Sequence, residues 1–141
     1  MGPVRILIVD DFEHWRNAVR SILAGDSRIE VVGECSDGAC AVQKTEELQP
    51  DLVLLDIQLP EINGFIAAQR IAKVAPNTKV LFLSTHGSLD MLREALSIGA
   101  GLVVKTDAAL DLLPVIWAVV QNEPIARFKI LNDESPDSYK M

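Results

Sequence analysis

Apolar residues occur along this chain in short runs, separated by longer segments with helical periodicity; the run 29–35 is interrupted by two glutamates and a glycine. The runs cover residues 4–9, 29–35, 52–56, 80–83 and 102–104. A short apolar run without polar alternation is typical of a strand buried on both faces of a parallel sheet. The segments between the runs place apolar residues three or four positions apart, as amphipathic helices do. The pattern therefore predicts five strands, each followed by a helix.

Capping residues and prolines mark the ends of the predicted helices. The first helix contains Trp15, and Asp11 or its neighbour can cap it. The next three helices are expected at about 39–48, 64–74 and 89–98. The last is expected over 112–121, with Asp111 as its cap and Pro114 in the first turn, where proline is tolerated.

Five strand–helix pairs joined by short connections imply an α/β fold with a doubly wound parallel sheet. Five pairs in 141 residues favour the strand order 2-1-3-4-5, the flavodoxin-like (βα)5 arrangement with a five-stranded parallel sheet. This order places the first and third strands side by side. Open sheets of this kind bind ligands at the carboxyl ends of their strands.

Composition and charge narrow the class of protein. At 49% hydrophobic and 23% charged residues the chain resembles an ordinary globular domain, and its net charge of −7 speaks against direct nucleic-acid binding by this segment. No signal peptide or bilayer-spanning apolar run is evident, so a cytoplasmic protein without membrane contact is expected. Cys35 and Cys40 fit no metal-binding spacing, and free buried thiols are their expected state in a reducing cytoplasm.

The last part of the chain has a different character. Helical periodicity is lost from Asn122 onward, and the polar segment 132–138 is typical of a linker. We expect a folded domain over 1–122, followed over 123–141 by a tail or the start of a linker.

Reactive or charged side chains follow four of the five predicted strands. They are Asp10, Asp11, Asp56, Ser84, Thr85 and Lys105. Crowded carboxylates raise one another's pKa unless a cation lies among them, and an oxygen-rich set of ligands suits Mg²⁺. A lysine and a hydroxyl at the same edge can bind an anion. The combination indicates a phosphoryl-transfer site, in which a carboxylate is the natural covalent acceptor because no histidine or cysteine nucleophile lies among these strand ends.

Several segments match a known family in joint spacing. They are Val9-Asp10-Asp11, the run from Asp51 to Pro60 with Asp56 in its middle, Asn63-Gly64, Leu83-Ser84 and Val104-Lys105. On these segments the sequence resembles a receiver domain of bacterial two-component response regulators over about 4–120. The amino-acid sequence at 31–34 and 49–53 resembles that of the receiver subclass that is joined to LuxR/NarL-type helix-turn-helix domains.

The resemblance implies that Asp56 accepts a phosphoryl group from a sensor histidine kinase. The implied Mg²⁺ ligands are Asp10 (largely through water), Asp11, Asp56 and the backbone carbonyl of Gln58. Lys105 would pair with a phosphoryl oxygen, and Ser84 would move toward it. The domain would be a regulator rather than an enzyme, because it would catalyse only its own phosphotransfer and slow dephosphorylation. Its expected output is transcription regulation by a C-terminal DNA-binding domain missing from this chain.

The sequence departs from the receiver pattern at three places that bear on how a change at the site would reach the output surface. Leu102 replaces the usual aromatic residue three positions before Lys105, the turn at 99–101 is one residue short, and Thr85 replaces a small apolar residue. The resemblance implies that a hydroxyl residue moving toward the phosphoryl group is coupled to a rotating aromatic ring. These three differences weigh against that coupling in this chain. One alternative is a stand-alone or pseudo-receiver that acts as a protein-interaction scaffold. Another is a flavodoxin-like module for a nucleotide or flavin, disfavoured because no glycine-rich phosphate loop follows the first strand.

The last helix has almost no polar face, and an exposed apolar helix face marks a protein interface. We therefore expect a homodimer through this helix, with the first helix beside it. The expected contact residues are Leu112, Leu113, Ile116, Trp117 and Val120. The alternative is that residues after Gln121 fold back over the helix through Ile125, Phe128, Ile130 and Leu131.

Overall fold

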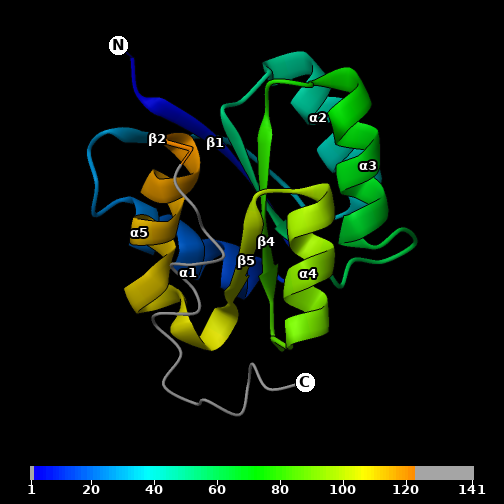
Figure 1. Ribbon diagram of the computed structural model, residues 1–141. Coiled ribbons are helices and arrows are strands. Elements are labelled where there is room, and N and C mark those ends of the chain that lie inside the picture. The colour runs from blue at the N-terminus through cyan, green and yellow to red at the C-terminus, as the bar shows by residue number, and fades with distance from the viewer. Residues whose placement is uncertain (1, 123–141) are drawn as a thin grey trace.

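The computed structural model describes residues 2–122 and has the predicted doubly wound architecture (Figure 1). Five parallel strands form one sheet in the order β2-β1-β3-β4-β5, so the flavodoxin-like fold prediction is confirmed. The strands are β1 (Val4–Val9), β2 (Ile29–Cys35), β3 (Leu52–Asp56), β4 (Lys79–Ser84) and β5 (Gly101–Val104). The helices are α1 (Glu13–Leu23), α2 (Gly38–Leu48), α3 (Gly64–Val74), α4 (Leu89–Ile98) and α5 (Ala108–Val120), and a 3-10 turn (Lys105–Asp107) precedes α5. The predicted tail, including Ile125, Phe128, Ile130 and Leu131, lies outside the described residues.

The sheet separates two apolar clusters. Figure 1 shows α1 and α5 on one face and α2, α3 and α4 on the other. On β1, Ile6 and Ile8 pack in the cluster with α1 and α5, whereas Leu7 and Val9 pack with the other three helices. All five residues of β3 are buried, and each large aliphatic side chain among them contributes about 1.5–3 kcal/mol. The burial of β3 therefore fixes where Asp56, its last residue, lies.

Two helix starts differ from the predictions. α5 begins at Ala108 rather than at residue 112, so Pro114 lies inside the helix. Ala108 and Leu112 are buried in the core. This burial offsets the loss of the backbone hydrogen bond that Pro114, which has no N–H, cannot donate. Asp11 does not cap α1, because the N-cap position is Phe12 and no side chain caps the helix; the Asp10 carboxylate accepts the N–H of Phe12 at 2.9 Å.

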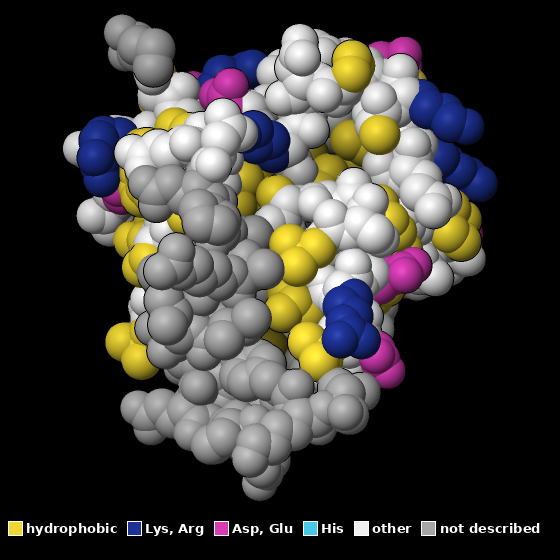
Figure 2. Space-filling view, in the orientation of Figure 1, with side chains coloured by type: hydrophobic (Ala, Val, Ile, Leu, Met, Phe, Trp, Pro, Cys, Tyr) yellow, Lys and Arg dark blue, Asp and Glu magenta, His cyan; other side chains and the backbone are white. Residues whose placement is uncertain are grey.

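The outer surface of α5 also differs from the predicted contact set. Leu112 and Ile116 are fully buried and pack in the core shared with α1, so their predicted role in a dimer contact is wrong. Leu113, Trp117 and Val120 are half-buried, and Leu110, which was not predicted, is 83% exposed. Figure 2 shows apolar side chains at the surface along the α5 edge of the molecule. An outer-layer helix that is apolar all round thus divides its residues between core and surface.

The cysteines are not the free buried thiols that the sequence suggested. Cys35 and Cys40 form a disulfide, and their Cα atoms are 5.7 Å apart. Cys35 ends β2 and Cys40 lies in the first turn of α2, so the tight connection between them brings the two side chains together. Their spacing of five residues gave no sign of this, because it is the strand-to-helix turn that places them side by side.

No helix within residues 2–122 has the length and apolar character needed to cross a membrane.

The first residue of α3 lies against the backbone that follows β3. The N–H of Gly64 donates to the carbonyl of Ile57 at 2.7 Å. A Cβ on Gly64 would lie 2.8 Å from the Cα of Ile57 and closer still to the carbonyl oxygen of Asp56. This close approach requires glycine and holds the loop that follows Asp56.

We expect Gly64→Ala to lower the free energy of unfolding by about 1–3 kcal/mol, because the added methyl group overpacks fixed backbone atoms. Urea unfolding followed by circular dichroism measures the change. Gly2→Ala is the matched control, since nothing lies within 4 Å of a Cβ there. Equal stability of Gly64→Ala and the wild type would contradict the close approach.

Candidate functional site

Three carboxylates meet at the carboxyl ends of β1 and β3. Asp10 and Asp11 follow β1, Asp56 ends β3, and the two strands pair directly, with Val9 opposite Leu55. One oxygen of each carboxylate lies within 4.8 Å of the other two. Asp10 and Asp56 are 1% and 4% exposed, whereas Asp11 is exposed to solvent. The strand order thus brings together the three acids that the sequence singled out.

Lys105 supplies the positive charge of this cluster. Its Nζ lies 2.6 Å from Oδ2 of Asp10 and 3.5 Å from Oδ2 of Asp56, and its side chain is only 13% exposed. Buried carboxylates without a partner are costly, and a buried cation between them offsets part of that cost. Lys105 therefore offsets only part of the negative charge of the two buried acids.

The acidity of Asp56 is altered by its surroundings. Burial raises the pKa of Asp56 to about 6, and the negative charge of Asp10 adds to this effect. Lys105 opposes it, as does the N–H of Gln58, which donates to Oδ1 of Asp56 at 3.1 Å. Asp56 is therefore mostly ionised at neutral pH yet poorly solvated, which favours bonding to a cation or an electrophile.

The groups at this edge of the sheet that could hold a metal ion all offer oxygen atoms. The loop after β3 is held by three backbone hydrogen bonds of Ile57. Its N–H donates to the carbonyl of Leu83 (3.1 Å), and its carbonyl accepts the N–H groups of Leu59 (3.2 Å) and Gly64 (2.7 Å). Gln58 follows at once, so its backbone lies next to the Asp56 carboxylate. Three carboxylates and a nearby carbonyl are the donor chemistry that suits Mg²⁺. The residues fit the predicted metal.

Ser84 ends β4, the strand beside β3, and is fully buried. Its Oγ accepts the N–H of His86 at 3.2 Å, so the hydroxyl is engaged in the turn after β4. Thr85 and His86 are both exposed. Ser84 therefore lies at the same edge as Asp56, with its hydroxyl bonded to the following backbone.

Two residues of α1 that the sequence had not indicated contact the site. The Nζ of Lys105 lies 5.2 Å from the centroid of the Trp15 ring, within the range of a cation–π interaction. Arg16 donates from Nη1 to the carbonyl of Asp10 at 2.7 Å and from Nε to Oε1 of Glu34 at 3.1 Å. An aromatic and a basic residue in the first turn after the two acids were the available signal, but their partners lie on other elements.

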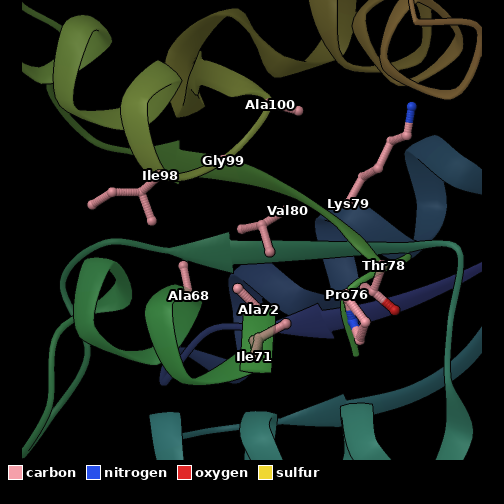
Figure 3. A pocket seen from close by; sticks show the side chains of 10 residues that line it. All are labelled: Ala68, Ile71, Ala72, Pro76, Thr78, Lys79, Val80, Ile98, Gly99 and Ala100. Atoms are coloured by element: carbon pink, nitrogen blue, oxygen red, sulfur yellow. The ribbon is translucent and has the colours of Figure 1, made fainter. Parts of the chain in front are cut away.

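A hollow of about 340 Å³ lies at the opposite edge of the sheet (Figure 3). Its lining is largely apolar and comes from α3, β4, the end of α4 and the adjoining loops, with Ala68, Ala72 and Val80 among its residues. Lys79 also lines it, but Nζ of Lys79 donates to the carbonyl of Val119 at 3.0 Å and thereby holds the end of α5. The hollow therefore offers little chemistry beyond apolar contact.

We expect Asp56→Asn to be more stable than the wild type by about 1–2 kcal/mol at pH 7.5 in the presence of a chelator. The pKa of Asp56 is about 6 in the folded chain, against an ordinary value of 3.8, so the folded state binds the proton more tightly. The stability of the wild type therefore falls as the pH rises from about 4 to about 6, and the variant lacks this loss. Urea unfolding from pH 4 to pH 8 measures the difference. A difference that does not depend on pH would contradict this explanation.

Comparisons with known proteins agree with this geometry. A family model described as the response regulator receiver domain matches residues 6–115. The response regulator protein VraR of Staphylococcus saprophyticus is 34% identical over 130 residues, which are 92% of this chain and 62% of VraR. The chemotaxis protein CheY of Thermotoga maritima is 42% identical over 96 residues, which are 68% of this chain and 79% of CheY. The chain thus spans less than two thirds of the length of VraR.

A solved structure shows the same fold. The signal receiver domain of the putative response regulator NarL from Mycobacterium tuberculosis superposes with a TM-score of 0.81 at 27% identity, covering 87% of this chain and all of that domain. The similarity to NarL and VraR supports the LuxR/NarL-like subclass. The chain belongs to the receiver domain family of two-component response regulators.

Proposed function

We propose that the chain is a phosphorylation-dependent signalling switch in which Asp56 accepts a phosphoryl group from the phosphohistidine of a sensor histidine kinase. The observation that supports this most is the buried Asp56 carboxylate, with its raised pKa, 3.5 Å from the Nζ of Lys105. An Asp56 oxygen bonds to phosphorus while the phosphorus–nitrogen bond breaks. The leaving imidazole keeps that electron pair and takes up a proton.

Asp10, Asp11, Asp56 and the backbone carbonyl of Gln58 would hold Mg²⁺. When bound, the ion supplies charge neutralisation for the phosphoryl oxygens. Lys105, already beside Asp56, would pair with an oxygen of the transferred group. The protein's contribution is then mainly position and charge, which is what phosphoryl transfer requires.

Ser84 would connect the site to the surface. Its Oγ accepts the N–H of His86, and the same hydroxyl can still donate its hydrogen to a phosphoryl oxygen, so a movement of Ser84 toward that oxygen would shift the turn that leads into α4. Leu102 is 3% exposed and packs in the same cluster as Phe82 and Leu92 of α4. A rotating aromatic ring is absent from that position, so the rearranged turn itself would carry the change to α4.

The proposal extends to the whole protein. We place the receiver domain over 1–122 and treat 123–141 as a tail or the start of a linker to an output domain. Transcription regulation by a C-terminal DNA-binding domain would be the output, and the greater length of VraR supports a further domain. The protein would act in the cytoplasm as a regulator, not as an enzyme with turnover. A pseudo-receiver scaffold is the alternative, and it would leave Asp56 unmodified.

We expect the chain to gain one phosphoryl group when it is incubated with Mg²⁺ and a small phosphodonor such as acetyl phosphate. Asp56→Asn should abolish the gain, and Lys105→Met should slow it by about a hundredfold, because a charge that stabilises the transition state is lost. Intact-mass spectrometry over time gives both results. Asp51→Asn, one residue before the start of β3, is the matched control and should react like the wild type. No gain by the folded wild type would favour the scaffold.

We also propose that phosphorylation promotes a homodimer through the outer surface of α5, formed by Leu110, Leu113, Trp117 and Val120. Trp117 is held in place, since its Nε1 donates to Oδ2 of Asp26 at 2.9 Å and the Arg28 guanidinium lies 4.2 Å from its ring centroid. Arg28 also lowers the pKa of Asp26 well below its usual range, so this arrangement keeps its charge. A rigid aromatic beside an exposed leucine is a common centre for an interface.

We expect Leu110→Glu to weaken the phosphorylated dimer by about tenfold or more, because a charge would have to be desolvated in an apolar contact. Size-exclusion chromatography with light scattering, at tens of micromolar, measures the dimer with and without the phosphodonor. Ile66→Glu on α3 is the control, since Ile66 is 38% exposed but lies on the other face of the sheet. A monomer under both conditions would contradict the proposed dimer.

A further inference from the structure

The disulfide lies at the same edge of the sheet as the acidic site. It joins the last residue of β2 to the first turn of α2 and closes a segment that we term the Cys35–Cys40 turn. Cys35 is 3% exposed, whereas Cys40 is half-buried and the more accessible of the two. Within residues 2–122 the turn has two separate connections to the residues around Asp56.

The first connection runs through the backbone of Asp10. The N–H of Asp10 donates to the carbonyl of Cys35 at 3.0 Å, where β1 and β2 end side by side. On the other side, Arg16 binds both the carbonyl of Asp10 and the Glu34 carboxylate next to Cys35. The backbone of Asp10 is therefore fixed to the end of β2 at Cys35, a member of the disulfide itself.

The second connection runs through the loop after β3. Oδ1 of Asp37 accepts the N–H of Cys40 at 2.8 Å, which caps α2 and orders the turn. Gly38 lies directly against Ile62 of the loop, since a Cβ on Gly38 would be 2.5 Å from Cγ1 of Ile62. Leu59 and Ile62 both pack in the apolar cluster that contains Cys35. The loop that holds Gln58 thus rests on the Cys35–Cys40 turn.

We propose that Cys35 and Cys40 are a redox modification site, with a dithiol reductant as substrate, whose oxidation state controls Mg²⁺ binding at Asp10, Asp11 and Asp56. The inference rests on the proposed function only for the identity of the metal site it acts on. A thiolate of the reductant attacks Sγ of Cys40, forms a mixed disulfide and releases the Cys35 thiolate. The second thiol of the reductant then releases Cys40 and leaves as its own disulfide, so two electrons and two protons end on Cys35 and Cys40.

Two physical arguments favour a switch over a purely structural bond. A disulfide that closes a short loop removes less entropy from the unfolded chain than one that closes a long loop, and we expect the domain to stay folded when the bond is reduced. Two free thiols need sulfur positions roughly 1.5 Å further apart than a bonded pair, and close packing passes such a change to the neighbours. Those neighbours are the carbonyl of Cys35, which accepts the N–H of Asp10, and Gly38, which lies against Ile62. In a reducing compartment, disulfides of this kind are usually transient and redox-sensing.

The test compares the oxidised and the dithiothreitol-reduced full chain. Alkylation with N-ethylmaleimide followed by intact mass should show two reactive thiols only after reduction. Reduction should weaken Mg²⁺ binding by about tenfold, as the loss of groups that orient metal ligands does. It should also shift the amide resonances of Asp10 and Gln58, which report on the two connections. The double variant Cys35→Ala/Cys40→Ala, with Cys40→Ala as a second version, should not respond to dithiothreitol.

Unchanged Mg²⁺ affinity and unchanged resonances after the two thiols are freed would overturn the inference. So would an equal response of the cysteine variants, or two reactive thiols before any reduction of protein that was prepared under oxidising conditions. A redox response of Mg²⁺ binding together with no phosphorylation in either state would support the inference and contradict the proposed function alone. The two proposals therefore fail separately.

Discussion

One buried charge arrangement holds the functional edge of the sheet together: the contacts of Lys105 with Asp10 at 2.6 Å and with Asp56 at 3.5 Å. Two carboxylates removed from water beside each other would be strongly unfavourable without a cation. Lys105 follows β5, and β4 lies between β5 and β3, so its long side chain must reach across the end of β4. The parallel order of the strands makes that reach possible, because all strand ends point to one edge. The apolar clusters on both faces of the sheet are what keep the strands in that order.

Much of this could be predicted from the sequence because it depends on local pattern and on chain topology. The five apolar runs determine the strands, and the strand order then brings Asp10, Asp11 and Asp56 together without any knowledge of side-chain contacts. The start of α5 was missed because Pro114 suggested a first turn, whereas burial of Ala108 and Leu112 extends the helix upstream. The surface of α5 was misjudged for a related reason. An apolar sequence shows that a helix avoids water but not which residues its neighbours already cover.

The features that could not be predicted from the sequence all depend on contacts between residues of different elements. Arg16 joins Asp10 to Glu34, and the disulfide joins β2 to α2, and neither pairing follows from spacing along the chain. Each lies outside the acidic cluster yet fixes the backbone that supports it. Residues of this kind decide how rigidly a charged site is held, and rigid placement matters for phosphoryl transfer because most of the catalytic effect comes from position.

The contact between Trp15 and Lys105 has a practical consequence. Indole emission responds to charges near the ring, and the Lys105 ammonium is 5.2 Å from the Trp15 centroid. The chain has only two tryptophans. The other, Trp117, lies on α5, and the Arg28 guanidinium is 4.2 Å from the centroid of its ring. The protein thus contains its own optical reporter of the electric field at the acidic cluster. No label is needed to follow the site in solution, whereas Trp117 lies in the proposed dimer surface and would report on that contact.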